Sequence, residues 1–486
     1  MRCRSLFQRG WYYTPMLAIE YANCLSTRVE EHGLDPALIE PGGEFDFAAR
    51  HLTGRLEKSR GTGWERWRDL ARGEMRARHV ADCAAMAERC AGRFDNLVVL
   101  GIGGSALGNI ALQNALNPPH YNLVDSARAG RPRVFVVDNV DPANFGAVMD
   151  TCASLGGIKR TLFNVISKSG ETAETAAQFM VIRERLRAEL GGKIADNIVA
   201  ITDPAKGTMR AICDREGIPT LPVPDGVGGR FSVLSPVGLF SAMMGGIDVD
   251  AMLDGADEMD RVCSRAPLRE NPAALLALLL VELGQRKGKT NHVMMPYANN
   301  LYSFADWFRQ LWAESLGKTA ESVAGPVYMG FTPIKALGAT DQHSQVQLYR
   351  DGPNDKVICL LGVEGYERDI TIPRGLGVDA LAYLEGATMG GLLRAERRAT
   401  EYALVESRRP NLTITFPRVD AFHIGQFIML WEVVTSYAGL MLGVDAYDQP
   451  AVETGKQATF GLMGRRGFEQ WKARVDEVLA DSPYTL

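Results

Sequence analysis

From about residue 96 onward, short apolar runs rich in β-branched residues alternate with stretches of helical period. The first five runs are bounded by turn-forming residues and are Leu97–Leu100, Val134–Val137, Phe163–Ile166, Ile198–Thr202 and Thr220–Val223. Fully apolar strands separated by helices are typical of a parallel sheet that is buried on both faces. The pattern therefore predicts an α/β fold with helical crossover connections.

A second alternation of the same kind begins near residue 273. Its predicted strands are His292–Met295, Val357–Leu361, Ile370–Ile372 and Leu412–Phe416. Its predicted helices are Ala273–Arg286, Tyr302–Leu316, Ala380–Thr400 and Ala421–Leu442. A helix at Pro236–Met244 and a charged segment to about Pro272 separate the two series. We therefore expect two α/β units, which a diverged duplication would explain.

The two ends of the chain have a different pattern. Residues 16 to about 95 are charged and mostly helical in period, and Arg465–Leu479 is predicted as a final amphipathic helix. Residues 1–15 are either a dispensable extension or a short terminus that is docked or frayed. The predicted division is 1–15 extension, 16–95 N-terminal helical segment, 96–272 first α/β domain, 273–445 second α/β domain, and 446–486 C-terminal segment with its helix.

Composition and charge narrow the class of partner. The 486 residues are 46% hydrophobic and 23% charged, which is ordinary for a globular protein and excludes a disordered or collagen-like chain. The formal net charge is −5 and no long basic run is present, so a nucleic acid is not expected as a partner. A phosphorylated substrate would need a local positive site against this acidic background.

Cysteine usage and hydropathy bear on the compartment. The eight cysteines form no CxxC pair, which favours reduced buried thiols over a disulfide framework or a zinc site. The first residues are basic but lack the continuous apolar core of a signal peptide. No uninterrupted apolar run of about 18 residues is present. We therefore expect a cytoplasmic protein that does not interact with a membrane.

A glycine-rich loop follows the first predicted strand. Leu97–Leu100 leads into Gly101–Gly108, which contains Gly103, Gly104 and Ser105. Glycines let the backbone approach an anion, and the N-terminus of the next helix offers free N–H groups. The loop also matches the loose G-x-G-x-x-A form of the dinucleotide fingerprint. However, the acidic residue Asp138 follows Gly103 by 35 residues, against a usual spacing of about 20. A purely structural tight turn remains an alternative.

A hydroxyl-rich turn follows the third predicted strand. Phe163–Ile166 ends in Ser167, Lys168 and Ser169, and Thr172 opens the next helix. Three hydroxyls and several backbone N–H groups at a helix N-terminus can satisfy the oxygens of a phosphate. Helix capping by Ser169 or Thr172 is the alternative, but it would explain one hydroxyl and not three.

These two loops and four later segments resemble the phosphoglucose isomerase family. The loops GIGGS and SKSGETAET resemble the paired sugar-phosphate loops of that family in its bacterial form. Four further segments resemble family signatures and follow in the family's order: Asp225–Ser232 with Ser235–Gly238, Gln310–Lys318, Gly338–His343, and Tyr447–Gln449 with Val452, Glu453 and Lys456. Together these segments extend over residues 101 to 456, which is most of the chain.

The resemblance implies a fold and an activity. The expected fold is two three-layer α/β/α sandwich domains of the sugar-isomerase type, with mainly parallel sheets and helical additions at both ends. The expected activity is the interconversion of glucose 6-phosphate and fructose 6-phosphate through ring opening and a cis-enediolate, in glycolysis and gluconeogenesis. The resemblance implies no metal or organic cofactor, and the sequence contains no HExxH motif. It also implies a homodimer with the active site at the subunit boundary.

The reaction needs a base that serves two adjacent carbons, a cation for the enediolate, and groups that open the sugar ring. One carboxylate suits the proton transfer, because it can receive and return a proton without changing place. Glu314 is the candidate base, although an exposed glutamate paired with Lys318 four residues on is the plainer interpretation without the resemblance. Arg230, on the glycine-rich turn, is the candidate cation, and a structural salt bridge is its alternative.

The remaining roles follow from the resemblance. A histidine can give or take a proton near neutral pH, so His343 is the candidate for ring opening, reaching across from the partner subunit. Lys456 is the second ring-opening candidate. The phosphate is expected to bind Ser105, Ser167, Ser169 and Thr172, with Lys168 nearby. Gly103 and Gly104 are expected to shape the pocket, and Gln449 to line it.

Two other functions fit parts of the sequence. A nicotinamide-dependent oxidoreductase would use the G-x-G-x-x-A loop but leaves the three-hydroxyl turn, Glu314 and Lys456 unexplained. A non-catalytic sensor of sugar phosphates would use both loops but has no need of Glu314, His343 and Lys456 together. Binding of NAD distinguishes the first from an isomerase, and the turnover of a Glu314→Gln variant distinguishes the second.

Overall fold

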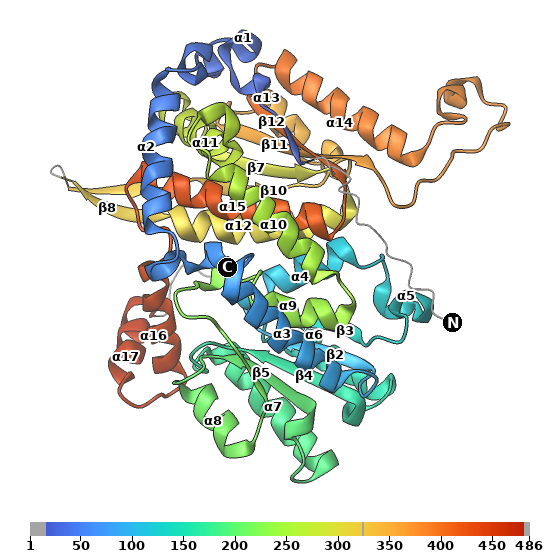
Figure 1. Ribbon diagram of the computed structural model, residues 1–486, viewed down its shortest axis with the longest axis vertical. Coiled ribbons are helices and arrows are strands. Elements are labelled where there is room, and N and C mark those ends of the chain that lie inside the picture. The colour runs from blue at the N-terminus through green and yellow to red at the C-terminus, as the bar shows by residue number, and fades with distance from the viewer. Residues whose placement is uncertain (1–15, 323–324, 481–486) are drawn as a thin grey trace, which may run out of the picture.

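The computed structural model describes residues 16–322 and 325–480. Its strands form two five-stranded sheets and one two-stranded hairpin. Each large sheet carries helices on both faces, and the two sheets occupy opposite ends of the molecule in Figure 1. The fold is therefore α/β with two three-layer units, as the sequence predicts. Residues 1–15, the predicted extension, lie outside the described residues.

The first sheet is entirely parallel. Its strands are β2 (Asn96–Leu100), β3 (Arg133–Val137), β4 (Thr161–Ile166), β5 (Ile198–Thr202) and β6 (Thr220–Pro222). They lie in the order β3-β2-β4-β5-β6 and match the five predicted strands. The chain moves outward from β2 to β3 and then returns to the other side of β2 at β4. This reversal is a topological switch point, where ligands bind in open α/β sheets.

Alternate residues of β2 enter two different cores. Leu97 and Val99 belong to a core shared with helices α3 (Gly73–Cys90), α4 (Leu107–Leu116) and α9 (Pro236–Gly245). Val98 and Leu100 belong to a separate core shared with α6 (Pro142–Ser154), α7 (Ala173–Leu190) and α8 (Thr208–Glu216). Because successive side chains of a strand point to opposite faces, this division explains the continuous apolar run.

The second sheet is parallel except at one edge. Its strands, in spatial order, are β1 (Ala18–Glu20), β12 (Asn411–Arg418), β11 (Lys356–Gly365), β7 (Asn291–Pro296) and β10 (Thr332–Lys335), with β1 antiparallel. Helices α11 (Pro272–Lys287), α12 (Tyr302–Leu316) and α15 (Ala421–Leu442) share a core with one face, while α13 (Val346–Asp351) and α14 (Met389–Glu406) cover the other. The predicted helices at 302–316 and 421–442 are confirmed with their bounds.

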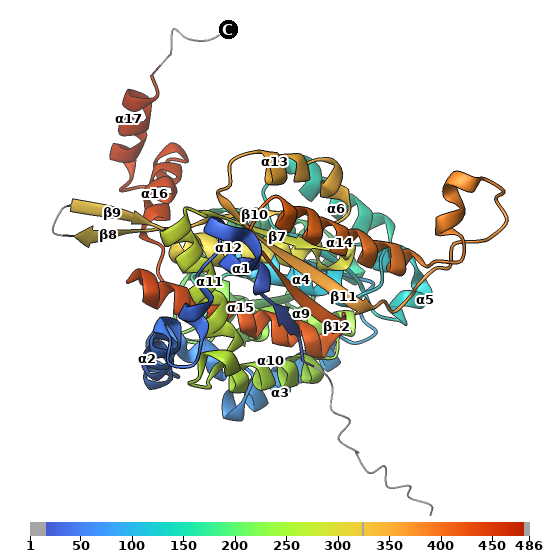
Figure 2. The same cartoon turned by 90° about the horizontal axis from the view of Figure 1, so that it is seen from above.

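The segment 366–388 departs from the prediction. Ile370–Ile372 is not a strand, because only Thr371 forms a bridge, with Thr388. The predicted helix Ala380–Thr400 is a short 3-10 turn at Asp379–Leu384 followed by α14. Gly386 between them has a positive φ of 79°, which interrupts a helix. Segment 366–388 projects from the body as an arm in Figures 1 and 2.

Several elements were not anticipated. The charged segment before residue 272 contains α10 (Val249–Cys263), and the last predicted helix is shorter, α17 (Glu469–Val478), and follows α16 (Glu453–Leu462). A hairpin of β8 (Lys318–Ser322) and β9 (Gly325–Met329) follows α12 directly. Helix α2 (Glu44–Ser59) packs on α11 and α15, so the N-terminal segment joins the second sheet as well as the first.

Helix α15 is long and apolar enough to cross a membrane by length and composition, but 89% of its most apolar window is buried inside the protein. It is therefore the core helix of this half of the molecule. Gly255 and Gly425 let α10 and α15 approach closely, since a Cβ on either would lie 1.8 Å from a backbone oxygen of the other helix.

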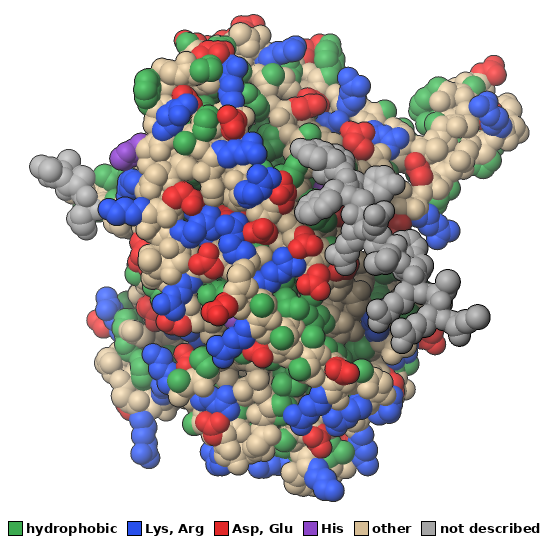
Figure 3. Space-filling model, in the orientation of Figure 1, with side chains coloured by type: hydrophobic (Ala, Val, Ile, Leu, Met, Phe, Trp, Pro, Cys, Tyr) green, Lys and Arg blue, Asp and Glu red, His purple; other side chains and the backbone are tan. Residues whose placement is uncertain are grey.

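The seven cysteines among the described residues are buried and free, as predicted for them. Figure 3 shows acidic and basic side chains intermixed over the face drawn.

Candidate active site

The two predicted phosphate loops lie side by side. The glycine-rich loop follows β2 and the hydroxyl-rich turn follows β4. These strands are neighbours in the sheet and run in the same direction, with Leu100 opposite Val165. Their carboxyl ends therefore open onto the same edge, at the switch point of the sheet.

The glycine-rich loop also contacts the turn that carries Arg230. A Cβ on Gly104 would lie 2.2 Å from the carbonyl oxygen of Gly229, so only glycine permits this approach. Gly103 has a φ of +56°, and a Cβ there would lie 2.8 Å from Nε2 of Gln310. The two glycines thus bring β2, the 3-10 turn Gly229–Phe231 and α12 together, which supports their predicted role in shaping the site.

The hydroxyls of the second turn are only partly used within the turn. The Ser167 hydroxyl accepts a hydrogen bond from Gly170 N at 3.0 Å, and the Ser169 hydroxyl accepts one from Glu171 N at 3.1 Å. Thr172 is the N-cap residue of α7, but its side chain makes no capping hydrogen bond. Helix capping therefore does not account for Thr172, and both serine hydroxyls keep a hydrogen to donate. Lys168 Nζ lies 5.0 Å from the centre of the Trp64 ring.

Glu314 lies in the last turn of α12 with its carboxylate held from two sides. Gln310 Nε2 donates to Oε2 at 2.9 Å, and Arg230 lies 3.3 Å from Oε1. The side chain is 26% exposed, so it is neither a solvated surface glutamate nor a closed core residue. Lys318 does not pair with this carboxylate and instead donates to the carbonyl oxygen of Glu314 at 2.7 Å. The plain i,i+4 ion pair considered for the sequence is therefore wrong.

The guanidinium of Arg230 is buried and fully occupied. Besides Glu314, it donates to the Ser315 hydroxyl, the Gln449 side-chain oxygen and the backbone oxygens of Ala446 and Asp448, at distances of 2.8–3.1 Å. Burial lowers the pKa of Arg230, and the charge of Glu314 opposes that shift. With its five N–H groups bound, the guanidinium is a fixed cation beside the carboxylate.

A cavity of about 680 Å³ opens at Glu314. Gln449 lines it, together with residues of the β8–β9 hairpin and of the chain after α15. These further lining residues include Gly317, Lys318, Tyr328, Met329, Val444 and Asp448. The cavity has the size of a small-molecule site, and the Glu314 carboxylate lies at its wall with Arg230 directly behind it.

His343 and Lys456 are not brought to this cavity within one chain. His343 is exposed on the 3-10 turn Thr340–His343 and is absent from the cavity lining. Lys456 is 53% exposed on α16 and pairs with Glu453 at 2.7 Å. The C-terminal segment does reach the hydroxyl-rich turn, because Arg465, between α16 and α17, pairs with Glu171 at 2.9 Å. The ring-opening roles of His343 and Lys456 therefore stay predictions.

Three residues of the site were not assigned a role from the sequence. Gln310, Ser315 and Lys318 each contact Glu314, Arg230 or the backbone of the same turn. The position of Gln310, one helical turn before Glu314, is the signal that could have identified it. The contacts of Ser315 and Lys318 depend on segments distant in sequence, which periodicity does not reveal.

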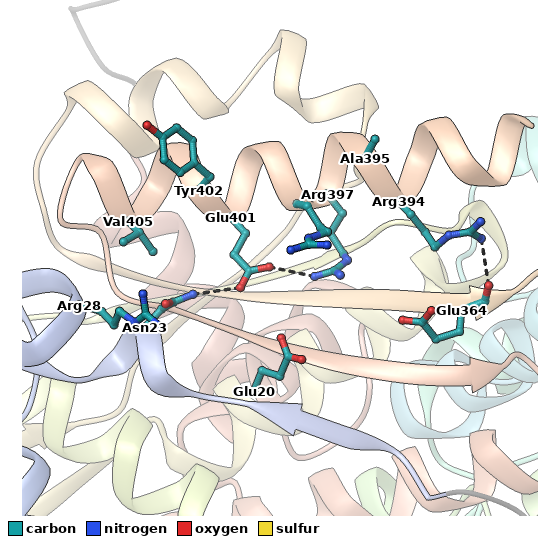
Figure 4. A pocket seen from close by; sticks show the side chains of 11 residues that line it. Glu20, Asn23, Arg28, Glu364, Arg394, Ala395, Arg397, Glu401, Tyr402 and Val405 are labelled. Carbon is teal, nitrogen blue, oxygen red and sulfur yellow. Dashed lines mark hydrogen bonds and ion pairs between the residues drawn. The ribbon is translucent and has the colours of Figure 1, made fainter. Parts of the chain in front are cut away.

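A second groove, of about 760 Å³, lies between α14 and β1 and contains none of the predicted residues. In Figure 4, Arg397 and Glu401 extend from α14 toward the sheet and pair with each other, and Asn23 donates to Glu401. Arg394 donates to the backbone oxygen of Glu364. Arg394, Arg397 and Glu401 are thus bound within the protein. Among the described residues, no group of three or more His, Cys, Asp and Glu side chains is arranged to hold a metal ion.

Comparison with known proteins identifies the family. The profile described as Phosphoglucose isomerase matches residues 80–464. The glucose-6-phosphate isomerase of Carboxydothermus hydrogenoformans is 43% identical over 84% of this chain and 87% of its own length. The glucose-6-phosphate isomerase of Rubrobacter xylanophilus is 42% identical over 88% of this chain and 96% of its own length. A solved structure from Thermus thermophilus, described as a hypothetical protein, superposes with a TM-score of 0.78 at 34% identity, covering 92% of this chain and 100% of that one. The chain therefore belongs to the phosphoglucose isomerase family.

Proposed function

We propose that this chain interconverts glucose 6-phosphate and fructose 6-phosphate, with Glu314 carrying the proton between C1 and C2. The observation that carries this proposal is the Glu314 carboxylate at the wall of a cavity, held by Gln310 and Arg230. The loop after β2 lies against the turn that carries Arg230, because Gly104 contacts the backbone of Gly229, and the loop after β4 follows the neighbouring strand. A base, a cation and the first of the two proposed phosphate loops are thus adjacent.

The phosphate is assigned to the two loops at the switch point. Ser105, Ser167, Ser169 and Thr172 supply hydroxyl donors, and the N-terminus of α7 adds free backbone N–H groups. Lys168 contributes positive charge at the same turn. Anchoring the phosphate here leaves the opposite end of an open-chain sugar free to extend toward α12.

In the proton transfer, the Glu314 carboxylate removes a proton from the carbon next to the carbonyl. The electron pair of that C–H bond forms the carbon–carbon double bond, and the carbonyl oxygen becomes the anion of an enediolate. Arg230 then stabilises this charge, because its guanidinium is already fixed beside the carboxylate. The protonated Glu314 returns the proton to the former carbonyl carbon. At the same time the hydroxyl proton of the other oxygen passes to the enediolate oxygen, so the first oxygen ends as a hydroxyl and the other becomes the carbonyl.

Ring opening is assigned to His343 and Lys456, and the active unit to a homodimer. His343 is exposed in a single chain, which suits a residue that completes the site of a second copy. The arm 366–388 projects from the body and exposes apolar side chains that a partner subunit would cover. These exposed residues are Ile370, Leu376, Val378, Leu381 and Tyr383. We assign the active site to the boundary between two subunits.

Hybrid dimers test this assignment. Glu314→Gln and His343→Ala variants are each expected to be nearly inactive alone. If each site takes Glu314 from one chain and His343 from the other, a hybrid contains one intact site. An equal mixture, dissociated and reassembled, then recovers about a quarter of wild-type activity. If both residues serve the same site from one chain, the hybrid has no intact site and no activity returns.

The broader assignments follow from the activity. The enzyme is proposed to act in the cytoplasm, in glycolysis and gluconeogenesis, and to use no cofactor. We propose domain boundaries at residues 15, 95, 272 and 445.

The direct test of the function is a coupled assay for glucose 6-phosphate formed from fructose 6-phosphate. The wild type should be active and the Glu314→Gln variant nearly inactive while still binding substrate, whereas equal turnover would overturn the role of Glu314.

A further inference from the structure

Lys318 is the first residue of β8 and lies directly after the C-cap of α12. Its side chain is 8% exposed although it carries a charge. Its ammonium group donates to three backbone oxygens: Glu314 O at 2.7 Å, Ser315 O at 3.1 Å and Asp448 O at 2.9 Å. An ammonium group has three N–H donors, so this one has none left for a ligand.

Two of these oxygens belong to the last turn of α12. Carbonyl groups at a helix C-terminus lack partners within the helix, and a cation there also interacts favourably with the helix dipole. Glu314 itself is in this turn, so the lysine restrains the backbone that carries the carboxylate. The third oxygen, on Asp448, also accepts a hydrogen bond from Arg230 at 3.1 Å. One carbonyl therefore connects the lysine with the arginine.

We propose that Lys318 is a positioning residue for catalysis, which fixes the Glu314 carboxylate relative to the Arg230 guanidinium. This inference rests on the proposed roles of Glu314 and Arg230. Without the lysine, the last turn of α12 and the segment 445–449 lose one of the two side chains that join them, and only Arg230 still binds both. The carboxylate and the guanidinium can then separate, although neither has been changed. A displacement of about 1 Å at a reacting group can reduce a rate about 100-fold.

The test compares Lys318→Met with a matched control, Lys289→Met. Methionine keeps most of the length of the side chain and removes its charge and donors. Lys289 is likewise buried, at 1% exposed, and its ammonium group donates to Asn354 O, but it lies before β7 and outside the cavity. The control therefore loses a buried lysine that binds a carbonyl, without touching the site. Lys318→Gln, which keeps a neutral donor, is measured in parallel.

Two inhibitors separate positioning from general damage. D-arabinonate 5-phosphate has a planar carboxylate that imitates the enediolate, whereas D-glucitol 6-phosphate is an open chain without that anion. Lys318→Met is expected to lower kcat by about 10- to 100-fold with little change in KM. It should weaken the binding of D-arabinonate 5-phosphate by about tenfold or more and leave the binding of D-glucitol 6-phosphate nearly unchanged. Only the first inhibitor carries an anion that depends on the position of the Arg230 guanidinium. Lys289→Met should keep the wild-type kcat and inhibitor ratio.

Each other outcome has a defined meaning. If Lys318→Met keeps the wild-type kcat and the wild-type ratio of the two inhibition constants, the positioning role is overturned. It is also overturned if the variant binds both inhibitors more weakly by the same factor. If both Lys318 variants fail to fold while Lys289→Met folds, Lys318 is a residue of general stability and the proposal also fails. Glu314→Gln is assayed in the same series, because full activity there refutes the proposed function itself and not the role of Lys318.

Discussion

Gln310 Nε2 donates a hydrogen bond of 2.9 Å to Oε2 of Glu314, one helical turn farther along α12. The same amide nitrogen lies over Gly103, where a Cβ would approach it to 2.8 Å. The glutamine therefore connects the carboxylate to the glycine-rich loop after β2. This relationship sets the orientation of the carboxylate toward the cavity, and several predictions depend on it.

Replacing Gln310 by leucine should lower kcat by about 10- to 100-fold, because a hydrogen bond to a charged group contributes about 1.5–3 kcal/mol. The carboxylate remains but loses its orientation, so the effect should be smaller than that of Glu314→Gln. Gln347→Leu is a matched control: Gln347 Nε2 donates to Asp351 four residues on, in an exposed helix away from the cavity. Steady-state kinetics of both variants provide the measurement. An unchanged kcat in Gln310→Leu would show that this hydrogen bond has no part in the reaction.

Replacing Gly104 by alanine should reduce kcat/KM by about 100-fold or more. The new Cβ would lie 2.2 Å from Gly229 O, so the glycine-rich loop and the Arg230 turn must separate. Gly146→Ala on α6 is the control, since a Cβ there meets no atom within 4 Å. Activity and thermal unfolding are measured for both. If Gly104→Ala keeps full activity, the two loops are not held together in the way the structure describes.

Replacing Thr172 by valine should raise KM for fructose 6-phosphate by about tenfold and leave kcat nearly unchanged. Valine has nearly the same shape, and the threonine side chain makes no capping hydrogen bond that would be lost. Thr151→Val on α6 is the control, because that hydroxyl donates only to Ala147 O on an exposed helix face. A KM equal to that of the wild type would exclude Thr172 from the phosphate site.

Glu216 should make the stability of the protein pH-dependent in acid. Hydrogen bonds from Arg183 lower the pKa of Glu216 to about 2, from 4.5 for an ordinary glutamate. Because the folded state holds the carboxylate ionised below the pKa of the unfolded chain, this contribution is complete above pH 4.5 and is lost as the pH falls toward about 2. Glu216→Gln should therefore be less stable than the wild type near neutral pH, with a difference that shrinks in acid.

Urea unfolding of both proteins between about pH 7 and about pH 3 measures this difference. Glu189→Gln, an exposed position on α7, is the control and should show a small difference at every pH. A gap between wild type and Glu216→Gln that stays constant over this range would show that Arg183 does not hold the carboxylate in its ionised form.

The sequence predicted those parts of the fold that depend on local pattern. The five apolar strands of the first sheet and helix α12 were found because burial on both faces, or on one, leaves a clear period. The prediction for segment 366–388 was wrong, because the apolar residues of this segment are exposed on an arm and form no core. Helix α10 was missed although its buried apolar residues recur at helical spacing and form the face that packs on α15.

The residues of the site were predictable where they lie in local sequence motifs, but the contacts between distant segments were not. Motif resemblance singled out Glu314 and Gln449, which line one cavity, and Arg230, which contacts both of them. It could not reveal that Asp448 O receives both Lys318 and Arg230, because that contact joins residues about 130 and 220 positions apart through backbone atoms. Nor could it reveal how close Gly104 lies to Gly229. Neither contact leaves a pattern in the local sequence.

The most direct test of the account is the isomerisation of fructose 6-phosphate in D₂O, followed by NMR of the glucose 6-phosphate formed. If Glu314 carries the proton, part of it exchanges with solvent during transfer, and the wild type should place deuterium at C2. The Glu314→Gln variant, with substrate bound, should incorporate almost none. Deuterium entering at the wild-type rate in the variant, or product without any deuterium from the wild type, would contradict a carboxylate that moves the proton.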